Sequence, residues 1–502
     1  MKALLFLLNS TYSDHKNIEE NPEYEYIINN SVRGAGIYIA AHKFREQGID
    51  AEVVDFLSAW TEDELVTFLE NKKDDNIKFL GISANFASYL YITEFIKKLE
   101  LYFPDAIKIV GGQRRFNQDL NADYYVSGFS EVALPALLKH ELYGDELIYT
   151  PNFKGKLIET KTGKYQTHLL PDYQTYYKDT DYITPADVLS LEIGRGCKFS
   201  CDFCSFSLIG LKHRTVRDSK NIRDELVRNY ELYGVTNYIL SDDTTNETTD
   251  RIRKLAEAVD GLDFNPTFAG FVRLDLISAH KDQIELLAQS RILSHYYGVE
   301  TFNRATGKTI GKGADPNRLK DTMLEIYEYT MKTIGEYHGD TGMIIGLPHE
   351  SIESVNQSYE WLKKYWSGVG QNVIWFPLLM EEDGVIYSKI FKNYEKYGYT
   401  IDSVNDAWGT GSPRPQLKLL QWKNEHMSLD YASTTLYGKY TQHWWDTGRP
   451  KSFGEAILVR ALYGNMNSST LGSHNTSSFL GDKTIEIEKY KRRKLAPYDY
   501  KR

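Results

Sequence analysis

Short apolar runs that look like buried strands alternate with amphipathic helical patterns along most of this 502-residue chain. The alternation occurs twice, first from residue 1 to about 140 and again from 188 to 377. Because strands joined by helices run parallel within one sheet, both regions are predicted to have an α/β fold. We expect a doubly wound parallel sheet in the first region and an incomplete (β/α)6 barrel of the TIM type in the second.

The first region carries glycines and small polar residues where its predicted strands end. Ligands of doubly wound sheets bind outside the carboxyl ends of the strands. The candidate ligand contacts in residues 1–140 are therefore Ser83, Gly111, Gly112 and Gly128. Residues 141–187, broken repeatedly by proline and glycine, are predicted to be a connector in which 156–159 and 165–169 pair as a hairpin.

The predicted barrel strands are 188–193, 236–240, 267–272, 294–299, 341–345 and 372–377. In parallel barrels the chemistry gathers at the carboxyl ends of the strands, so the functional residues should follow each run. Residues 378–502 are interpreted as a C-terminal extension that supplies substrate-side elements.

All three cysteines of the chain lie within eight positions, directly after the first predicted barrel strand. Cys197, Cys201 and Cys204 have the spacing C-x3-C-x2-C, and glycines at 194 and 196 allow the backbone to turn there. Thiolates are soft ligands that hold iron–sulfur clusters. Three of them can hold a [4Fe-4S] cluster and leave one iron open to a small molecule.

Two other interpretations of the cysteines stay open at this point. Structural zinc needs a fourth ligand, which His213 could supply. Free cysteine is also common as a small buried apolar residue. An odd number of thiols at such close spacing argues against disulfides.

The cysteine spacing, with Phe203 directly before the last thiol, resembles the signature of radical S-adenosylmethionine (SAM) enzymes. The resemblance implies that Cys197, Cys201 and Cys204 bind a [4Fe-4S] cluster whose open iron is chelated by SAM. It implies reductive cleavage of SAM to a 5′-deoxyadenosyl radical. It also implies a one-electron donor such as flavodoxin or ferredoxin as a partner.

Further segments match this family at the predicted strand ends. By the resemblance, the SAM contacts are Phe203, Asp242, Asp243, Arg273, Glu300 and Gly346. The paired aspartates would hold the SAM ammonium group, and the segment 342–350 would contact the adenine. Arg273 would pair with a carboxylate or a ribose oxygen.

The first region is similar to the cobalamin-binding domain of one radical SAM subgroup, through "AEVVDF", "LGISANF", "IVGGQRRF" and "VSGFSEVALPALL". It lacks the D-x-H-x-x-G segment whose histidine ligates cobalt in that subgroup. Arg114 and Arg115 would meet phosphates or crowd a corrin ring. The resemblance therefore leaves two alternatives, cobalamin-dependent methylation and cobalamin-free hydrogen abstraction or rearrangement. A non-catalytic iron–sulfur sensor or binding protein is a remoter alternative.

Three cysteines leave no thiols for auxiliary clusters, which argues against methylthiotransferases. The formal net charge of −10 disfavours nucleic acid as a partner. The sequence has no apolar run of about 18 residues, so we expect no membrane span. The few thiols and the oxygen-sensitive cluster point to a cytoplasmic enzyme.

Overall fold

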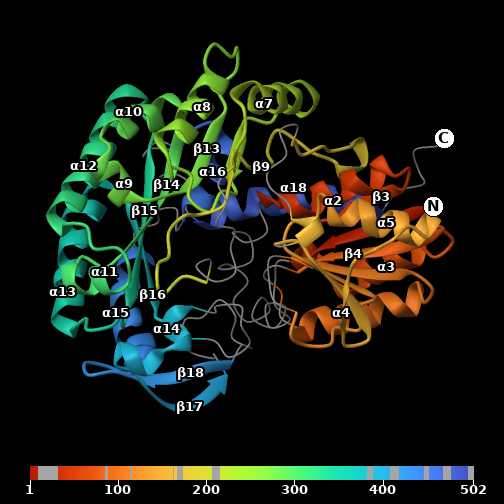
Figure 1. Cartoon of the computed structure of the whole chain (residues 1–502). Coiled ribbons are helices and arrows are strands. Elements are labelled where there is room, and N and C mark those ends of the chain that lie inside the picture. The colour runs from red at the N-terminus through yellow and green to blue at the C-terminus, as the bar shows by residue number, and fades with distance from the viewer. Residues whose placement is uncertain are drawn as a thin grey trace. The chain divides into compact units, whose positions relative to one another are not determined.

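The computed structural model describes residues 1–8, 32–84, 87, 89–112, 116–161, 163–166, 173–205, 215–380, 388–406, 418–445, 452–466 and 476–495. The chain divides into two compact units. Unit 1 contains Met1–Ser190 and Leu480–Arg502, and unit 2 contains Leu191–Phe479. Figure 1 labels many of the elements of both units. The end of the chain, which we had assigned to the C-terminal extension, is thus part of unit 1.

Unit 1 is built on a seven-stranded sheet in the order β3-β1-β4-β5-β6-β8-β7. Every neighbouring pair is parallel except β7 with β8, so the predicted parallel sheet is confirmed. In chain order the strands are β1 (Lys2–Leu7), β3 (Asp50–Val54), β4 (Ile77–Ser83), β5 (Ile107–Gly112), β6 (Tyr124–Ser127), β7 (Thr150–Asn152) and β8 (Gly155–Glu159).

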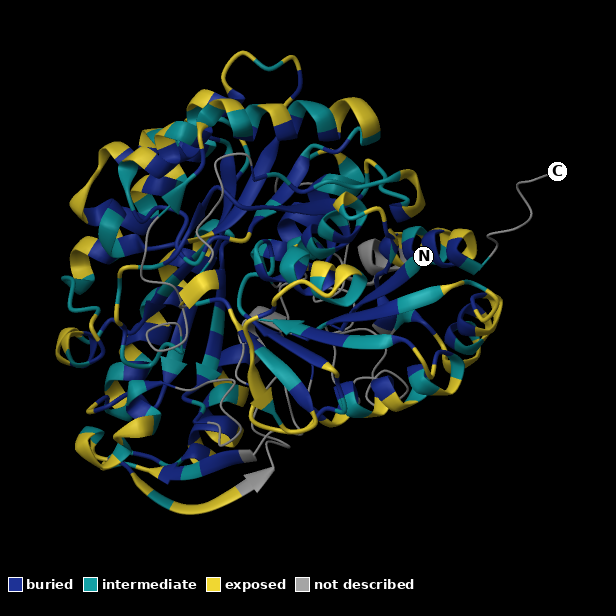
Figure 2. Ribbon diagram, turned by 45° about the vertical axis from the view of Figure 1, so that its right-hand side comes forward, coloured by how far each residue is buried: buried dark blue, intermediate teal, exposed yellow. Residues whose placement is uncertain are grey.

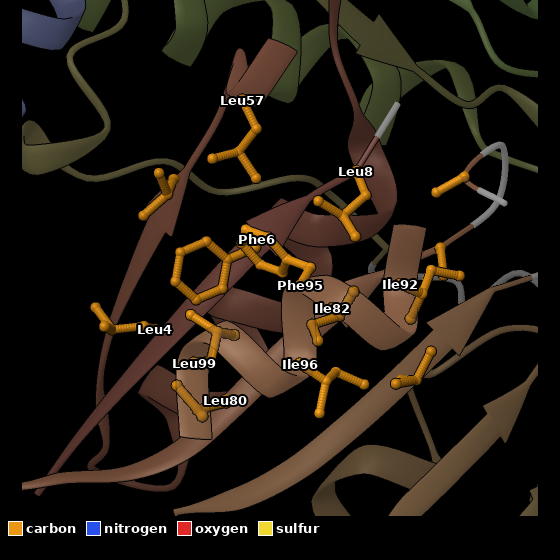
Figure 3. Close-up of a cluster of buried hydrophobic side chains, with 14 of the residues drawn as sticks. Leu4, Phe6, Leu8, Leu57, Leu80, Ile82, Ile92, Phe95, Ile96 and Leu99 are labelled. Atoms are coloured by element: carbon orange, nitrogen blue, oxygen red, sulfur yellow. The ribbon is translucent and has the colours of Figure 1, made fainter. Parts of the chain in front are cut away.

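The helices of unit 1 cover both faces of this sheet because side chains alternate along each strand. Leu4 and Phe6 of β1 belong to one apolar cluster with α3, α4 and α18, part of which is shown in Figure 3. Ala3 and Leu5 belong to a second cluster with α2 and α5. These helices are α2 (Ala35–Glu46), α3 (Glu62–Asn71), α4 (Tyr89–Tyr102), α5 (Ala133–Tyr143) and α18 (Thr476–Leu495).

The predicted hairpin of the connector is wrong in its pairing. Strand β8 pairs antiparallel with β7, which precedes it, through Asn152 opposite Gly155. A tight turn at Phe153, where φ is +54°, closes this pair locally. Residues 163–165 form a single 3-10 turn instead of a strand, and 167–169 lie outside the described residues.

Unit 2 contains β12 to β16, and the predicted barrel strands follow the order β16-β15-β14-β13-β12-β9. All pairs from β12 to β16 are parallel. The strands are β9 (Val188–Leu191), β12 (Asn237–Leu240), β13 (Thr267–Val272), β14 (Ile292–Glu300), β15 (His338–Ile345) and β16 (Asn372–Pro377). The boundary between the units falls within β9, whose first residues pair in parallel with β2 (Val32–Arg33).

The strands of unit 2 are mostly buried, and the helices carry exposed residues on their outer sides (Figure 2). The helices between the strands are α7 (Ser219–Tyr233), α8 (Thr249–Val259), α9 (Leu274–Ala279), α10 (Asp282–Gln289), α11 (Arg304–Thr309), α12 (Pro316–Thr333) and α13 (Ile352–Trp361). Smaller elements are the antiparallel pairs β10 (Gly194–Arg195) with β11 (Thr215–Val216) and β17 (Thr400–Asp406) with β18 (Lys418–Lys423), and the helices α14 (Lys389–Lys392) and α15 (Tyr437–Trp445).

Helix α16 (Phe453–Tyr463) packs against strands β12 to β15. The hydrogen bonds between this helix and the strands involve strand residues in the first half of each strand. Arg460 donates to Asn237 Oδ1 at 3.1 Å, and Ser294 Oγ donates to the Phe453 carbonyl at 3.0 Å. At its first residue the helix also reaches the carboxyl end of β13, where the Phe453 ring lies 5.0 Å from the ring of Phe271.

Unit 1 contains a buried ion cluster that ties α18 to the rest of the unit. The Asp187 carboxylate lies 3.1 Å from Arg33 Nη2 and 3.3 Å from Lys483 Nζ. Burial opposes ionisation of Asp187, but the two cations outweigh this effect and lower its pKa to about 2. The carboxylate therefore stabilises the fold above its unfolded pKa of about 4, and this contribution is lost as the pH falls toward 2.

We expect Asp187→Asn to lower the free energy of unfolding by about 3–5 kcal/mol at neutral pH, because two buried cations lose their shared carboxylate. Urea unfolding of anaerobic protein, followed by far-UV circular dichroism, measures this change. Lys220→Met removes an exposed ion pair with Asp224 and should leave the free energy of unfolding nearly unchanged, because solvent screens such pairs. Equal effects of the two substitutions would show that the buried cluster does not hold α18.

Candidate functional site

The three cysteines lie on the loop that follows β9. Gly196, directly before Cys197, has φ of +90°, a conformation that strains any residue with a side chain. Cys201 is buried, and Cys197 and Cys204 are half-buried. The Cys204 amide donates to the Cys201 carbonyl at 3.1 Å, and the Asp202 amide donates to the Ile310 carbonyl at 3.1 Å. Backbone bonds inside and outside the loop thus fix the course of the chain between the last two thiols.

Arg273, at the carboxyl end of β13, lies beside Cys201. Its Nη1 is 3.2 Å from Cys201 Sγ, and its guanidinium carbon lies 3.7 Å from the centre of the Phe199 ring. Asp275 accepts from Nε at 3.0 Å and from Nη2 at 2.6 Å. The side chain that we expected to pair with SAM is therefore engaged by the cysteine loop and a neighbouring carboxylate.

The two adjacent aspartates after β12 lie in different surroundings. Asp242 is buried, accepts from the Ile193 amide at 3.0 Å and lies 3.5 Å from Arg251 Nη1. Asp243 is half-buried, and its carboxylate accepts no hydrogen bond from the residues that the structure describes. Burial raises the pKa of both carboxyls to about 7, and the Glu192 charge adds to the rise. Asp242 therefore supports the strand end before the cysteine loop, whereas the Asp243 carboxylate has no such partner among the described residues.

Arg251 of α8 joins the aspartate loop to the cysteine loop, and we did not predict it from the sequence. Its side chain is 1% exposed. It donates to the Thr244 carbonyl at 2.8 Å and to Glu247 at 3.1 Å. Glu247 accepts in turn from the Lys198 amide at 3.0 Å. The available signal was helical spacing, because position 251 shares the buried face of α8 with Leu255 and Ala258.

Two further polar contacts flank the cysteine loop, and we did not predict either of them. Thr244 Oγ1 lies 3.6 Å from Cys197 Sγ. Arg195 and Glu192 form a buried pair with two contacts of 2.7 Å. The first contact joins the Cys197 thiol to the residue after Asp243. The second fixes Glu192, whose charge acts on Asp243.

Glu300 and Phe203 come together through Lys312. Glu300 ends β14 with φ of +70°, beside an irregularity in the pairing with β15. Its carboxylate lies 3.1 Å from Lys312 Nζ, which also donates to the Gly298 carbonyl. The same ammonium lies 5.5 Å from the centre of the Phe203 ring. The last residue of the fourth barrel strand is thus linked to the residue before the last cysteine.

Gly346 follows β15 with φ of +92° and lies against Trp422 of β18. A side chain at this position would overlap the Trp422 ring. The Gly346 carbonyl accepts from the Tyr399 hydroxyl at 2.6 Å. The C-terminal hairpin thus packs directly on the segment 342–350 that we expected to contact adenine.

Glu350, four residues further on, is a buried carboxyl with one partner. It accepts from the Thr301 hydroxyl, and within the described part of the chain its Oε2 has no hydrogen-bond partner. Burial raises the pKa of Glu350 to about 8, although the bond from Thr301 opposes the rise. The group is therefore protonated in the folded protein at neutral pH.

The strand ends of unit 1 bring the four predicted ligand contacts to one edge of the sheet. The Ala84 amide, next to Ser83, donates to the Gly111 carbonyl at 2.9 Å, and the Gly128 amide donates to the Gly112 carbonyl at 2.9 Å. Gly128 has φ of +108°. Arg114 and Arg115 lie outside the described residues, as does the alternative zinc ligand His213.

In the described ranges, no three His, Cys, Asp or Glu side chains are grouped in a way that could hold a metal ion. The case for a cluster therefore depends on the chemistry and spacing of the three thiols. No helix within these ranges is long and apolar enough to span a membrane.

A raised pKa at Glu350 predicts a stability difference that depends on pH. The folded group keeps its proton up to about pH 8, whereas the unfolded group loses it near pH 4.3. The wild type should therefore lose stability relative to Glu350→Gln by up to about 1.4 kcal/mol per pH unit between these values. Urea unfolding of both proteins at about pH 6 and about pH 8 measures the difference. Parallel stability curves would show that Glu350 titrates normally.

The chain is similar to known proteins in its sequence and in its structure. Residues 191–362 match the sequence model of the radical SAM superfamily. The chain is 26% identical over 173 residues to an uncharacterized methyltransferase of Pyrococcus horikoshii, covering 34% of this chain and 35% of that protein. It is 22% identical over 163 residues to an anaerobic magnesium-protoporphyrin IX monomethyl ester cyclase of Synechocystis sp., covering 32% of each. The chain thus matches about a third of the length of each curated relative.

Two solved structures share the fold over nearly the whole chain. One is the radical SAM methyltransferase TsrM from Kitasatospora setae, solved with cobalamin and a [4Fe-4S] cluster. Its TM-score is 0.65 at 12% identity, covering 98% of this chain and 99% of that one. The other is the cobalamin-dependent SAM radical enzyme OxsB, with a TM-score of 0.60 at 13% identity, covering 98% of this chain and 71% of that one.

At these identities the structures establish the fold, and the family match covers the region that carries the three thiols. Residues 191–362 are a radical SAM domain, in a chain with the fold of radical SAM enzymes that carry an N-terminal cobalamin-binding-like domain.

Proposed function

We propose that this protein is a radical SAM enzyme that cleaves SAM reductively at a [4Fe-4S] cluster held by Cys197, Cys201 and Cys204. The observation that carries the proposal is the placement of all three thiols on one loop after β9, inside the region that matches the family. The donor set fits the cluster because it supplies three thiolates and leaves one iron for SAM. When bound, the cluster supplies one electron to the sulfonium of SAM.

The residues around the loop bind and orient SAM in this proposal. Asp243, whose carboxylate is half-buried and accepts no described hydrogen bond, takes the SAM ammonium group. Glu300 faces the ribose, and the backbone around Gly346 contacts the adenine. Asp242 contributes indirectly, because it holds the Ile193 amide and Arg251 in place. A flavodoxin or ferredoxin delivers the electron.

Methyl transfer with cobalamin is the reaction class that the fold supports best. TsrM and OxsB are described with cobalamin, and the Pyrococcus relative is named a methyltransferase. In unit 1 the residues Ser83, Gly111, Gly112 and Gly128 end or follow strands at one edge of the sheet, the edge where ligands of such sheets bind. Cobalamin, when bound there, supplies methyl-group chemistry.

Cobalamin binding in this chain does not involve a histidine ligand to cobalt in our proposal. Within the described part of unit 1 the histidines are His42 and His140. His42 stacks on Tyr176 with ring centres 4.5 Å apart, and His140 Nδ1 lies 2.6 Å from the Asp145 carbonyl. Neither follows a strand of the sheet. We place the enzyme in the cytoplasm, where reducing conditions preserve thiolates and the cluster.

Anaerobic reconstitution tests the function directly. We expect about four irons and four sulfides per chain, and loss of both in the Cys197→Ala, Cys201→Ala, Cys204→Ala triple variant. After addition of SAM, a reductant and hydroxocobalamin, the wild type should form 5′-deoxyadenosine, and S-adenosylhomocysteine would report methyl transfer. Stoichiometric zinc in place of iron would contradict the cluster.

The same experiment separates the two reaction classes. Visible absorbance of cobalamin that survives desalting is expected of the methyltransferase. 5′-Deoxyadenosine without retained cobalamin would remove methyl transfer and leave hydrogen abstraction. A cluster that never cleaves SAM would instead support a sensor.

Asp243→Asn should weaken SAM binding about 10- to 100-fold, because a hydrogen bond between charged groups contributes about 1.5–3 kcal/mol. Its iron content should be unchanged. Equilibrium dialysis of SAM against reconstituted protein measures the affinity. Asp250→Asn is the matched control, because that carboxylate is exposed at the start of α8. An Asp243→Asn affinity equal to that of the control would remove Asp243 from the site.

A further inference from the structure

Two groups hold the Arg273 guanidinium in one orientation. Asp275 binds two of its nitrogens at 3.0 and 2.6 Å, and the Phe199 ring lies against its face at 3.7 Å. The third nitrogen, Nη1, lies 3.2 Å from Cys201 Sγ. With 8% of its surface exposed, the residue is almost removed from water. An N–H group is therefore aimed at one sulfur of the proposed cluster by contacts that do not involve the cluster.

The backbone of Arg273 is fixed as firmly as its side chain. Its amide donates to Asn246 Oδ1 at 2.7 Å, and its carbonyl accepts from Asn246 Nδ2 at 3.0 Å. The Asn246 amide also donates to Gln283 Oε1 at 2.9 Å. With the backbone anchored in this way, turning the guanidinium away from Cys201 would break both of its bonds to Asp275.

Hydrogen bonds to cluster sulfurs are one of the factors that set the reduction potential of iron–sulfur clusters. An N–H donor withdraws negative charge from the thiolate. It stabilises the reduced cluster more than the oxidised one, because reduction adds one negative charge to the iron and sulfur atoms. A nearby cation in a site of low dielectric acts in the same direction.

We propose that Arg273 is a positioning residue that raises the reduction potential of the cluster through its bond to Cys201 Sγ, which makes electron transfer from the external donor easier. This inference rests on the cluster of the proposed function. The step is a one-electron reduction of the cluster, and the flavodoxin or ferredoxin that supplies the electron is oxidised. Asp275 and Phe199 hold the guanidinium in the orientation that makes the bond.

The test is a redox titration of the reconstituted full-length protein without SAM, followed by electron paramagnetic resonance of the reduced cluster. We expect Arg273→Gln to lower the equilibrium constant for reduction about tenfold, which is a shift of about 59 mV to lower potential for one electron. Arg318→Gln, an arginine of α12 that binds the Ser278 carbonyl, serves as the control.

Iron and sulfide are counted in every variant before titration. A full cluster with unchanged potential in Arg273→Gln would overturn the inference and leave the proposed function standing. If Arg273→Gln loses iron, Arg273→Lys keeps a cation near the thiol, and a full cluster with a smaller shift in that variant supports the inference. Loss of iron in both would overturn it, since Arg273 would then be needed for assembly. A wild type without a cluster would defeat the proposed function itself.

Discussion

The site in unit 2 depends on one buried cation, Arg251. Its guanidinium lies 3.5 Å from Asp242, 3.1 Å from Glu247 and 2.8 Å from the Thr244 carbonyl. Through Asp242 it reaches the strand end before the first cysteine, and through Glu247 it reaches the Lys198 amide just after it. Desolvation makes such a charge costly alone, so the carboxylates and the cation must be retained together. The loop that carries the thiols is thus fixed by its neighbour on the next strand.

This arrangement explains why the two adjacent aspartates, Asp242 and Asp243, lie in different surroundings. Asp242 turns into the protein, where Arg251 compensates its charge, and Asp243 stays half-buried beside Glu192 with no described hydrogen bond to its carboxylate. Burial raises the pKa of both carboxyls to about 7, so the charged form of each is disfavoured in the protein alone, but only Asp242 has an amide donor and a nearby cation. Burial of a carboxyl without a hydrogen-bond donor is a cost that binding of an ammonium group can remove.

The periodicity of apolar residues and the spacing of the motifs were enough to predict the sheets and the positions of the site loops. Each of these features depends on residues that are close together in sequence. These patterns predicted strands β9 and β12 to β16 and the residues that follow them. They could not predict the contacts of Arg273 with Cys201 or of Lys312 with Glu300, which depend on side chains from different loops. The pairing of β8 with β7 was missed because a two-residue turn at Phe153 competes locally with a longer connection. The packing of α18 on unit 1 could not be predicted, because no pattern in the nearby sequence indicates it.

The packing of α18 on unit 1 determines the order in which unit 1 can complete its folding. Tyr490 and Ile487 complete the apolar cluster over β1 and β4, Lys494 pairs with Glu52, and Lys483 pairs with Asp187. The sheet of unit 1 is made from the first residues of the chain, yet its core lacks these groups until α18 exists. During synthesis Glu52 and Asp187 are charged and without these lysines, and one face of the sheet lacks its last helix. Closing so long a loop costs little more free energy than closing a short one. The contact of α18 with the sheet is therefore compatible with a stable fold, but it forms slowly. Unit 1 therefore reaches its final stability only after unit 2 has been synthesised.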